Sequence, residues 1–383
     1  MLTMRKLFKL VLLLAFLFVA VRGTDARAEA AEPYSGTVIC APGVVGDCAP
    51  MGPAEYIRRL EADGIRLPYD TLGWRTPDVN LNYLPYLYGQ VVTNNAPVYG
   101  SMEDAAKARN PIYRMDGQTL YISYEYTEVV DGMRVYMISP GVWMNAVNVH
   151  RIGTPTFQGL EFSKTPRNPF GWILTPVETR SEPGYQTGSY TGSWLYRQEI
   201  VQVYSIETAE NLEWLQIAPG EWIEKRFIGL VRPQSAPPFD EIDGRWIEIN
   251  LYEQTVAIYE GHRLVFATMI SSGIEPFWTR PGLFQITEKL ETTPMSGSFE
   301  TDGSDYYYLE DVPWTMYFDE ARALHGAYWH TGYGYPRSHG CVNLSPGDAR
   351  WIFEWAEVGD WVYVHDPSGL TPTDPSLYGS GGA

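Results

Sequence analysis

The sequence predicts a mainly β protein, and three observations support that fold class. Between residues 88 and 232, runs of β-branched and aromatic residues such as TLYISYEYTEVV are separated by Gly, Pro, Asn and Asp. One pattern in this region occurs twice, 79 positions apart, as ISPGVWM from Ile138 and IAPGEWI from Ile217. From residue 244 onward, alternating apolar residues predict further strands, with a single stretch of helical spacing after them.

The composition is that of a large acidic protein. The chain has 383 residues, of which 45% are apolar and 14% aromatic, and its formal net charge is −18. This length predicts several domains, since a usual domain has about 100–200 residues. The negative charge disfavours contact with the phosphate backbone of a nucleic acid, so we expect no nucleic-acid partner.

The first 28 residues have the features of a secretory signal peptide. A basic start ending at Lys9 precedes an apolar run at 10–21, and residues 26–28 read Ala-Arg-Ala, a small-x-small pattern typical of a cleavage site. The apolar run is short for a bilayer span, so we expect membrane contact only through this segment and before its removal. The mature protein is therefore expected outside the cytoplasm, in the periplasm or cell wall.

Residues 29–87 form an N-terminal segment in which we predict a short helix at 53–62. Export implies an oxidising compartment, and Cys40 and Cys48 lie close together around a Pro-Gly turn. We therefore expect a Cys40–Cys48 disulfide, which leaves Cys341 as a free reactive thiol. The alternative pairing joins Cys341 to one of the other two.

The repeated pattern indicates two copies of one small all-β domain. We assign module 1 to residues 88–160 and module 2 to residues 168–232, whose openings YGQVV and FGWIL also correspond. The late Pro-Gly-x-Trp turn into a strand makes both resemble bacterial SH3-like β-barrel modules. Two roles stay open for them: binding cell-wall glycan or peptide, or only spacing and supporting the next domain.

After a Pro-rich linker at 233–238, the last domain is predicted over residues 244–366. Alternation within 245–259 predicts a hairpin, which a Glu-Gly turn joins to a strand over 264–269.

One short helix is predicted near the end of this domain. Ser345-Pro346-Gly347-Asp348 has the residues of a helix start, and Gly359 ends the helix. Asp348 is therefore interpreted as a capping residue in preference to a catalytic acid. Residues 367–383, rich in Pro, Ser and Gly, are expected to be a flexible tail.

The residues that could carry out catalysis are concentrated in one stretch, residues 323–343, which reads ALHGAYWHTGYGYPRSHGCVN. A cysteine attacks a carbonyl as its thiolate, and near neutral pH it needs a base or a positive environment. Histidine is the usual base, and the stretch contains three of them: His325, His330 and His339. Gly340 allows a substrate to approach the backbone closely, as a backbone oxyanion hole requires. The motif predicts a nucleophile loop with a histidine base.

At these residues the chain resembles the L,D-transpeptidase (YkuD) catalytic domain. The family pattern is a histidine, a loop, then Ser/Thr-His-Gly-Cys, an apolar residue, and Arg or Asn. Here it reads His325, and then SHGCVN from Ser338 to Asn343, with a loop that is a little short for the family. The stretch TRPGLFQI at 279–286 resembles a strand entry of the family. The resemblance covers 244–366 and implies a YkuD-like β-sandwich with a short helix.

The resemblance implies 3→3 cross-linking of peptidoglycan stem peptides through a cysteinyl thioester. Cys341 would be the nucleophile and His325 the general base, oriented by the Gly326 carbonyl. The backbone N–H groups of Gly340 and Cys341, with His339 close by, are candidates for the oxyanion hole. If the fold brings thiol and imidazole together, we expect an ion pair to lower the pKa of Cys341 and raise that of His325.

Further site residues follow from the same resemblance. Ser338 and Asn343 are expected to fix the loop or the substrate backbone, and Trp329 either forms an aromatic substrate wall or packs structurally. No metal or organic cofactor is needed, and carbapenems are expected to act as covalent inhibitors.

Other interpretations stay open. Cys341 could be a buried structural thiol, or it could bind zinc together with the three histidines, although no CxxC or HExxH spacing supports zinc. The same thioester chemistry resolved by water would give an L,D-carboxypeptidase. A cell-wall-binding scaffold with an inactive enzyme domain is the third alternative.

Overall fold

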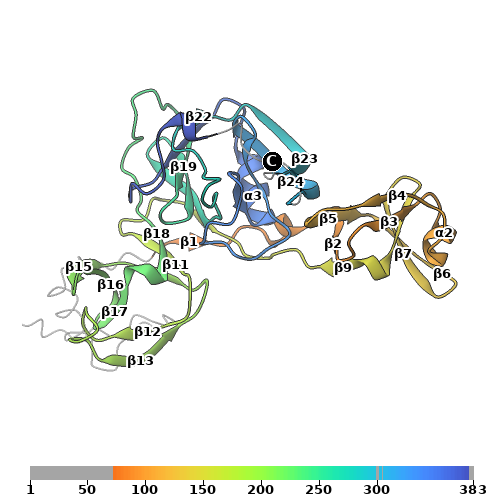
Figure 1. The fold of residues 1–383 in the computed structure, drawn as a ribbon. Helices are drawn as coiled ribbons and strands as arrows, with labels where there is room; N and C mark the ends of the chain where they lie inside the picture. Colours follow the sequence, from red (N-terminus) through yellow and green to blue (C-terminus); the bar gives the residue numbers. More distant parts are fainter. Residues whose placement is uncertain (1–71, 299–301, 304, 379–383) are drawn as a thin grey trace, which may run out of the picture. The chain divides into compact units, whose positions relative to one another are not determined.

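The computed structural model describes residues 72–298, 302–303 and 305–378 (Figure 1). The fold is mainly β, as predicted, with two short α-helices in the described part, α2 (Met102–Lys107) and α3 (Pro346–Trp355). The predicted signal peptide, the helix at 53–62 and the Cys40–Cys48 disulfide lie outside the described residues. No helix within the described ranges is long and apolar enough to cross a membrane.

Module 1 consists of two small antiparallel arrangements of strands. One is a five-stranded sheet in the order β4-β3-β8-β7-β6, and the other pairs β5 with β2 and β2 with β9. The strands are β2 (Leu87–Val91), β3 (Ala96–Tyr99), β4 (Pro111–Met115), β5 (Thr119–Tyr124), β6 (Tyr126–Val130), β7 (Met133–Ser139), β8 (Val142–Asn145) and β9 (Val149–Ile152).

Module 2 has the same strand order. Its five-stranded sheet runs β13-β12-β17-β16-β15, and its second sheet runs β14-β11-β18. The strands are β11 (Phe170–Ile173), β12 (Val177–Arg180), β13 (Tyr190–Leu195), β14 (Ile200–Gln202), β15 (Ser205–Ala209), β16 (Leu212–Ala218), β17 (Glu221–Glu224) and β18 (Ile228–Val231). The repeated sequence pattern thus corresponds to a repeated topology, and the SH3-like assignment of both modules stays a prediction.

The last domain is a sandwich of two sheets. The first is seven-stranded, in the order β1-β10-β21-β20-β19-β27-β22, and the second contains β26-β25-β24, with β23 also paired to β24. The strands are β1 (Trp74–Arg75), β10 (Leu160–Phe162), β19 (Arg245–Asn250), β20 (Thr255–Glu260), β21 (Arg263–Met269), β22 (Gly282–Gln285), β23 (Glu288–Gly297), β24 (Tyr307–Asp319), β25 (Arg322–Gly326), β26 (Val342–Leu344) and β27 (Trp361–His365).

Between these sheets lies the largest apolar core, which α3 helps to close. Ile247, Ile258 and Leu324 are among its fully buried members, and Ile352 joins it from α3. Ser345 caps the helix as expected, because its hydroxyl accepts a hydrogen bond from the Asp348 N–H at 3.2 Å. The Asp348 carboxylate itself is buried and accepts hydrogen bonds from the Gly159 N–H and the Thr268 hydroxyl. Asp348 therefore links α3 to β21 and to the segment before β10, a role beyond the predicted cap.

Two boundaries differ from those predicted. Module 1 was expected to extend to residue 160, but its last strand ends at Ile152, and β10 pairs with β21 of the last domain. The physical reason is burial, since Leu160 and Phe162 join a core of the last domain. The expected flexible tail also contains ordered structure: Pro375–Leu377 form a 3-10 helix, and Tyr378 lies under the Arg322 guanidinium at 5.3 Å.

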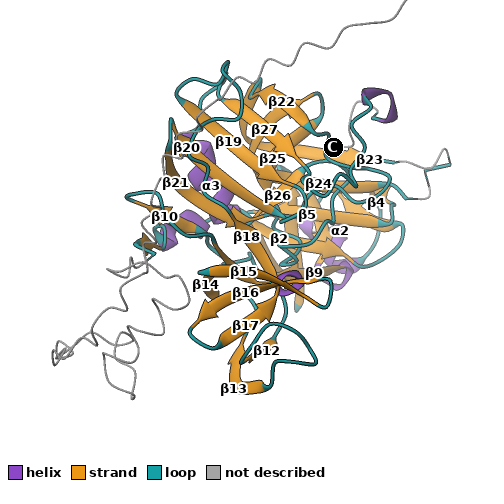
Figure 2. Cartoon of the chain, turned by 90° about the vertical axis from the view of Figure 1, so that its left-hand side faces the viewer, coloured by secondary structure: helices purple, strands orange, loops and turns teal. Residues whose placement is uncertain are grey.

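Module 1 and the last domain share a sheet. β5 pairs in parallel with β24, so the complete strand order is β26-β25-β24-β5-β2-β9 (Figure 2). The Tyr88 ring of β2 stacks on Tyr328 at 3.7 Å, and the Tyr88 hydroxyl donates a hydrogen bond to the Asp311 carbonyl at 2.9 Å. Continuous strand pairing and a shared aromatic core therefore hold module 1 against this domain.

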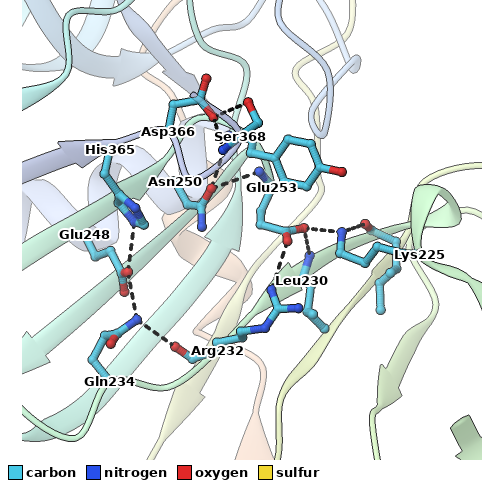
Figure 3. Close-up of polar contacts among 12 residues, drawn as sticks. Lys225, Leu230, Arg232, Gln234, Glu248, Asn250, Glu253, His365, Asp366 and Ser368 are labelled. Atoms are coloured by element: carbon cyan, nitrogen blue, oxygen red, sulfur yellow. Dashed lines mark hydrogen bonds and ion pairs between the residues drawn. The ribbon is translucent and has the colours of Figure 1, made fainter. Parts of the chain in front are cut away.

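A buried carboxylate, Glu253, is one of the contacts that join module 2 to the last domain. Figure 3 shows the Glu253 carboxylate among three groups from the end of module 2. These are the Lys225 ammonium at 2.6 Å, the Leu230 N–H at 3.0 Å and the Arg232 guanidinium at 3.2 Å. Only 8% of the Lys225 side chain and 2% of the Glu253 side chain are exposed. A charge this deeply buried stabilises the fold only while its partner is present.

We expect Glu253→Ala to destabilise the protein strongly, because it leaves the Lys225 ammonium buried without its carboxylate. Breaking a buried pair from one side costs about 3–5 kcal/mol. Urea unfolding followed by tryptophan fluorescence measures the effect. Arg263→Gln is the matched control, because its ion pair with Glu260 is exposed and is worth about 0–1 kcal/mol. Equal, small shifts for both variants would contradict a structural role for Glu253.

Candidate active site

The register of two parallel strands brings the predicted nucleophile and base to one face. β25 and β26 pair so that His325 lies opposite Asn343 and Leu324 opposite Val342. Cys341 directly precedes β26, two positions before Asn343, and side chains two positions apart in an extended chain share a face. His325, Cys341 and Asn343 all line one cavity of about 350 Å³.

Most of the predicted site residues line this cavity. From the last domain it is lined by Met295, Asp305, Tyr307, Leu309, His325, Trp329, His330, Arg337, Ser338, His339, Cys341 and Asn343, and from module 1 by Gln118, Thr119 and Tyr121. The predicted residues Gly326 and Gly340 are not among its lining and contribute through their backbone groups.

The surroundings of His325 favour a neutral imidazole. The side chain is buried, and its Nδ1 lies 3.4 Å from the Gly326 carbonyl oxygen, the partner that the family resemblance implied. That carbonyl is an acceptor, so the ring proton belongs on Nδ1 and Nε2 is left with its lone pair. The pKa of His325 is lowered to about 4, mainly by burial. The hydrogen bond to the Gly326 carbonyl raises this pKa, but its effect is smaller. At neutral pH this imidazole is available as a base.

Cys341 is also neutral in the resting protein. Burial raises the pKa of its thiol to about 11, opposed by a backbone hydrogen bond from Ala323 and by the Arg322 charge. The Sγ atom lies 3.6 Å from the Ala321 carbonyl oxygen. The ion pair expected if the two groups met would lower the pKa of Cys341 and raise that of His325, whereas burial moves both pKa values in the opposite directions. Both groups are therefore neutral at rest, and proton transfer must accompany attack on a substrate.

His330 lies in the same cavity but has both ring nitrogens engaged. Its Nδ1 accepts a hydrogen bond from the Gly332 N–H at 3.1 Å, so the ring proton is on Nε2. Nε2 lies 3.0 Å from the Asn343 side chain, which accepts that proton when its amide oxygen faces the ring. Because neither nitrogen is left to accept a substrate proton, His325 is the better candidate for the base.

The nucleophile loop is held by hydroxyl groups. The Ser338 hydroxyl donates a hydrogen bond to the Cys341 carbonyl and accepts one from the Gly340 N–H at 3.2 Å. Thr279 donates a hydrogen bond to the Gly340 carbonyl at 2.8 Å. Gly340 has a φ of +122°, which favours glycine. Its N–H is directed to Ser338, so of the two expected oxyanion donors the Cys341 N–H remains the candidate.

Aromatic rings flank the thiol and the imidazole. Trp329 lines the cavity and stacks over His325 with ring centroids 5.7 Å apart, so it both packs against the base and faces the substrate space. His339 lies between Phe277 at 5.0 Å and Tyr307 at 5.5 Å.

Sequence reasoning missed several residues of the cavity. Arg337 directly precedes Ser338 within the stretch 323–343, and its charge could have singled it out. Arg322 directly precedes that stretch and is not among the lining residues, but its charge lowers the pKa of the Cys341 thiol. Tyr121 and Gln118 lie about two hundred positions upstream, and only the β5–β24 pairing brings them to the cavity. Within the described ranges, no group of three or more His, Cys, Asp or Glu side chains could hold a metal ion.

Comparison with known proteins points to one family. Residues 244–364 match the sequence profile of YkuD, the L,D-transpeptidase catalytic domain. YciB of Bacillus subtilis (strain 168), named as an L,D-transpeptidase, is 28% identical over an alignment of 125 residues. The match covers 28% of this chain and 59% of YciB.

Solved structures of the same family are also similar to part of the chain. The L,D-transpeptidase of Stackebrandtia nassauensis is 25% identical, and the match covers 34% of this chain and 58% of that one with a TM-score of 0.27. The L,D-transpeptidase LdtMt1 in complex with imipenem is 18% identical, with 54% of this chain and 98% of that one covered and a TM-score of 0.30. This chain spans less than two thirds of YciB and of the Stackebrandtia structure.

Proposed function

We propose that this protein, whose residues 244–364 form a YkuD-type L,D-transpeptidase catalytic domain, cross-links peptidoglycan stem peptides through a Cys341 thioester. The observation that carries the proposal is the shared cavity of His325, on β25, and Cys341, directly before the parallel neighbouring strand β26. A buried thiol and a neutral imidazole in one cavity suit acyl transfer, because the thiol must lose its proton as it attacks.

The proposed first half-reaction forms the thioester. The Cys341 sulfur attacks the carbonyl of the third stem residue while the thiol proton passes to Nε2 of His325. The carbonyl oxygen gains negative charge, for which the Cys341 N–H is the candidate donor. When the intermediate collapses, the C–N bond to the terminal D-amino acid breaks, and His325 returns the proton to the leaving amine.

The second half-reaction transfers the acyl group. The side-chain amine of a diamino acid on a neighbouring stem attacks the thioester, and His325 takes a proton from that amine. The C–S bond breaks, the sulfur regains the proton, and the product is a 3→3 peptide cross-link. The proposed place of action is outside the cytoplasm, supported by the signal-like features of residues 1–28.

The test is the product formed from purified stem peptides. We expect the chain without residues 1–28 to convert tetrapeptides into a cross-linked dimer with release of the terminal D-amino acid, detected by mass spectrometry. A tripeptide without dimer would identify an L,D-carboxypeptidase, and no product at all would favour the scaffold alternative. By analogy with LdtMt1, which was solved in complex with imipenem, we also propose that imipenem acylates Cys341.

A further inference from the structure

The floor of the cavity spans two parts of the chain. In the paired strands β23, β24 and β5, Met295 lies opposite Leu309 and Leu309 opposite Tyr121. The next row on this face pairs Tyr307 with Thr119. All five side chains line the cavity that holds Cys341. Module 1 therefore supplies the third strand of the floor.

The edge of module 1 is fitted closely to β24. The Gln118 N–H donates a hydrogen bond to the Tyr306 carbonyl at 2.8 Å, which fixes the start of β5 at the cavity. Gly117 makes this approach feasible, because a Cβ there would lie 2.9 Å from the Tyr306 carbonyl oxygen. The Tyr121 ring packs against Tyr328 and Trp329 at 6.2 and 6.4 Å. These contacts hold Gln118 and Tyr121 in defined positions at the cavity.

Two side chains of opposite charge, Arg337 and Asp305, line this cavity. Burial raises the pKa of Tyr121, and the Arg337 charge lowers it. Burial lowers the pKa of His330, and the Arg337 charge lowers it further. Asp305 instead opposes the effect of burial on the pKa of His339. Arg337 packs over Gly332, and the structure pairs its guanidinium with none of the described carboxylates. Asp305 already accepts a hydrogen bond from the Ser298 hydroxyl at 2.6 Å.

We propose that Arg337, together with Gln118 and Tyr121 of module 1, binds a carboxylate of the donor stem peptide beside the Cys341 thiol. A guanidinium is the side chain best suited to a carboxylate, and a phenol and an amide add neutral hydrogen-bond donors. The inference rests on the proposed function and deepens it: module 1 becomes a wall of the substrate site.

The test measures release of the terminal D-amino acid from three synthetic tetrapeptides by the chain without residues 1–28. One peptide has all its carboxylates free, one is amidated at its C-terminus, and one is amidated at its side-chain carboxylates. We expect Arg337→Gln to lower kcat/KM on the free-acid peptide by about 10–100-fold, the range for a hydrogen bond to a charged group. Amidation of the bound carboxylate should cost wild type a similar factor.

The decisive outcome is that the loss of kcat/KM caused by Arg337→Gln and the loss caused by amidating the bound carboxylate do not add up. Arg337→Gln should lose little further activity on the peptide whose bound carboxylate is amidated, and whichever amide shows this identifies the carboxylate. Tyr121→Phe and Gln118→Ala should each lower kcat/KM several-fold, on the same peptides that respond to Arg337→Gln. Arg134→Gln removes one exposed charge from module 1 and is expected to leave every rate unchanged.

Two measurements separate failure of this inference from failure of the proposed function. Alkylation of Cys341 by iodoacetamide, a neutral reagent, should proceed equally in wild type and Arg337→Gln, which shows that the thiol is intact. If Arg337→Gln loses the same factor on all three peptides, or loses nothing, the carboxylate subsite is wrong. If wild type releases no D-amino acid from any peptide, the proposed function itself fails.

Discussion

Cys341→Ala is expected to abolish cross-linking while the protein stays folded. Loss of a nucleophile that acts together with a base costs at least about 10⁴-fold in rate. The substitution removes only one sulfur atom from the cavity wall, so the free energy of unfolding should fall by about 1 kcal/mol. Mass spectrometry of the cross-linked dimer measures the first effect, and thermal unfolding the second. Full activity in this variant would contradict a cysteine mechanism.

EDTA provides an independent check on the same site. We expect no loss of activity at chelator concentrations that remove zinc, because the proposed chemistry uses only the thiol and the imidazole. An enzyme that loses activity with the chelator and recovers with added zinc would instead support a zinc site at the histidines and Cys341.

His325→Gln is expected to change both the rate and the pH dependence of Cys341 acylation by imipenem. In wild type, a neutral His325 accepts the thiol proton, so the second-order rate should be flat from about pH 5 to 8. In the variant the rate should follow the small thiolate fraction and rise about tenfold per pH unit, because burial raises the pKa of the thiol to about 11. At pH 7 the variant should be slower by about 10²–10⁴-fold.

The direction of the acid limb follows from burial of His325. Its pKa in the folded protein is lowered to about 4, below the value of about 6.5 for an unperturbed histidine. The imidazole therefore stays a base until the pH falls towards 4, and wild type should lose acylation activity only there. The unfolded chain binds the proton from about pH 6.5 downward, so His325 also makes the fold less stable as the pH falls between these two values.

Two histidine variants serve as comparisons. His262→Gln removes an exposed histidine next to β21 and should leave the rate and the profile unchanged. His330→Gln should keep the flat profile, because both ring nitrogens of His330 are already hydrogen-bonded, although its contact with Asn343 is lost. If His330→Gln gives the rising profile and His325→Gln does not, the base is His330.

Features that depend on neighbouring residues could be predicted from the sequence. The hairpin within 245–259 appears as β19 and β20 with Ile247 opposite Ile258, because alternation specifies which side chains share a face. The cap of α3 could be predicted because it is a local contact. The Ser345 hydroxyl accepts a hydrogen bond from the N–H of Asp348, only three residues later. The repeated strand order of the two modules likewise follows from a repeated local pattern.

The chemistry of the motif could also be predicted from the sequence, because it depends on the identity of a few residues close together in the chain. His325 and the Ser-His-Gly-Cys run ending at Cys341 are short and specific, and their identity alone indicated a nucleophile and a base. Nothing in the motif, however, distinguished the roles of His325 and His330. That distinction depends on which hydrogen bonds each ring makes, and the partners of His330 are the Gly332 N–H and the Asn343 side chain.

Only the tertiary structure decided how the site is charged and what encloses it. Residue types indicated a shift towards an ion pair if thiol and imidazole met. The depth of burial, which sums the packing of many distant residues, instead makes Cys341 and His325 neutral. Tyr121 reaches the cavity because β5 pairs with β24 across about two hundred positions of chain. A pairing between distant strands leaves no local signature, because it depends on the complementarity of two edges that meet only when the chain folds.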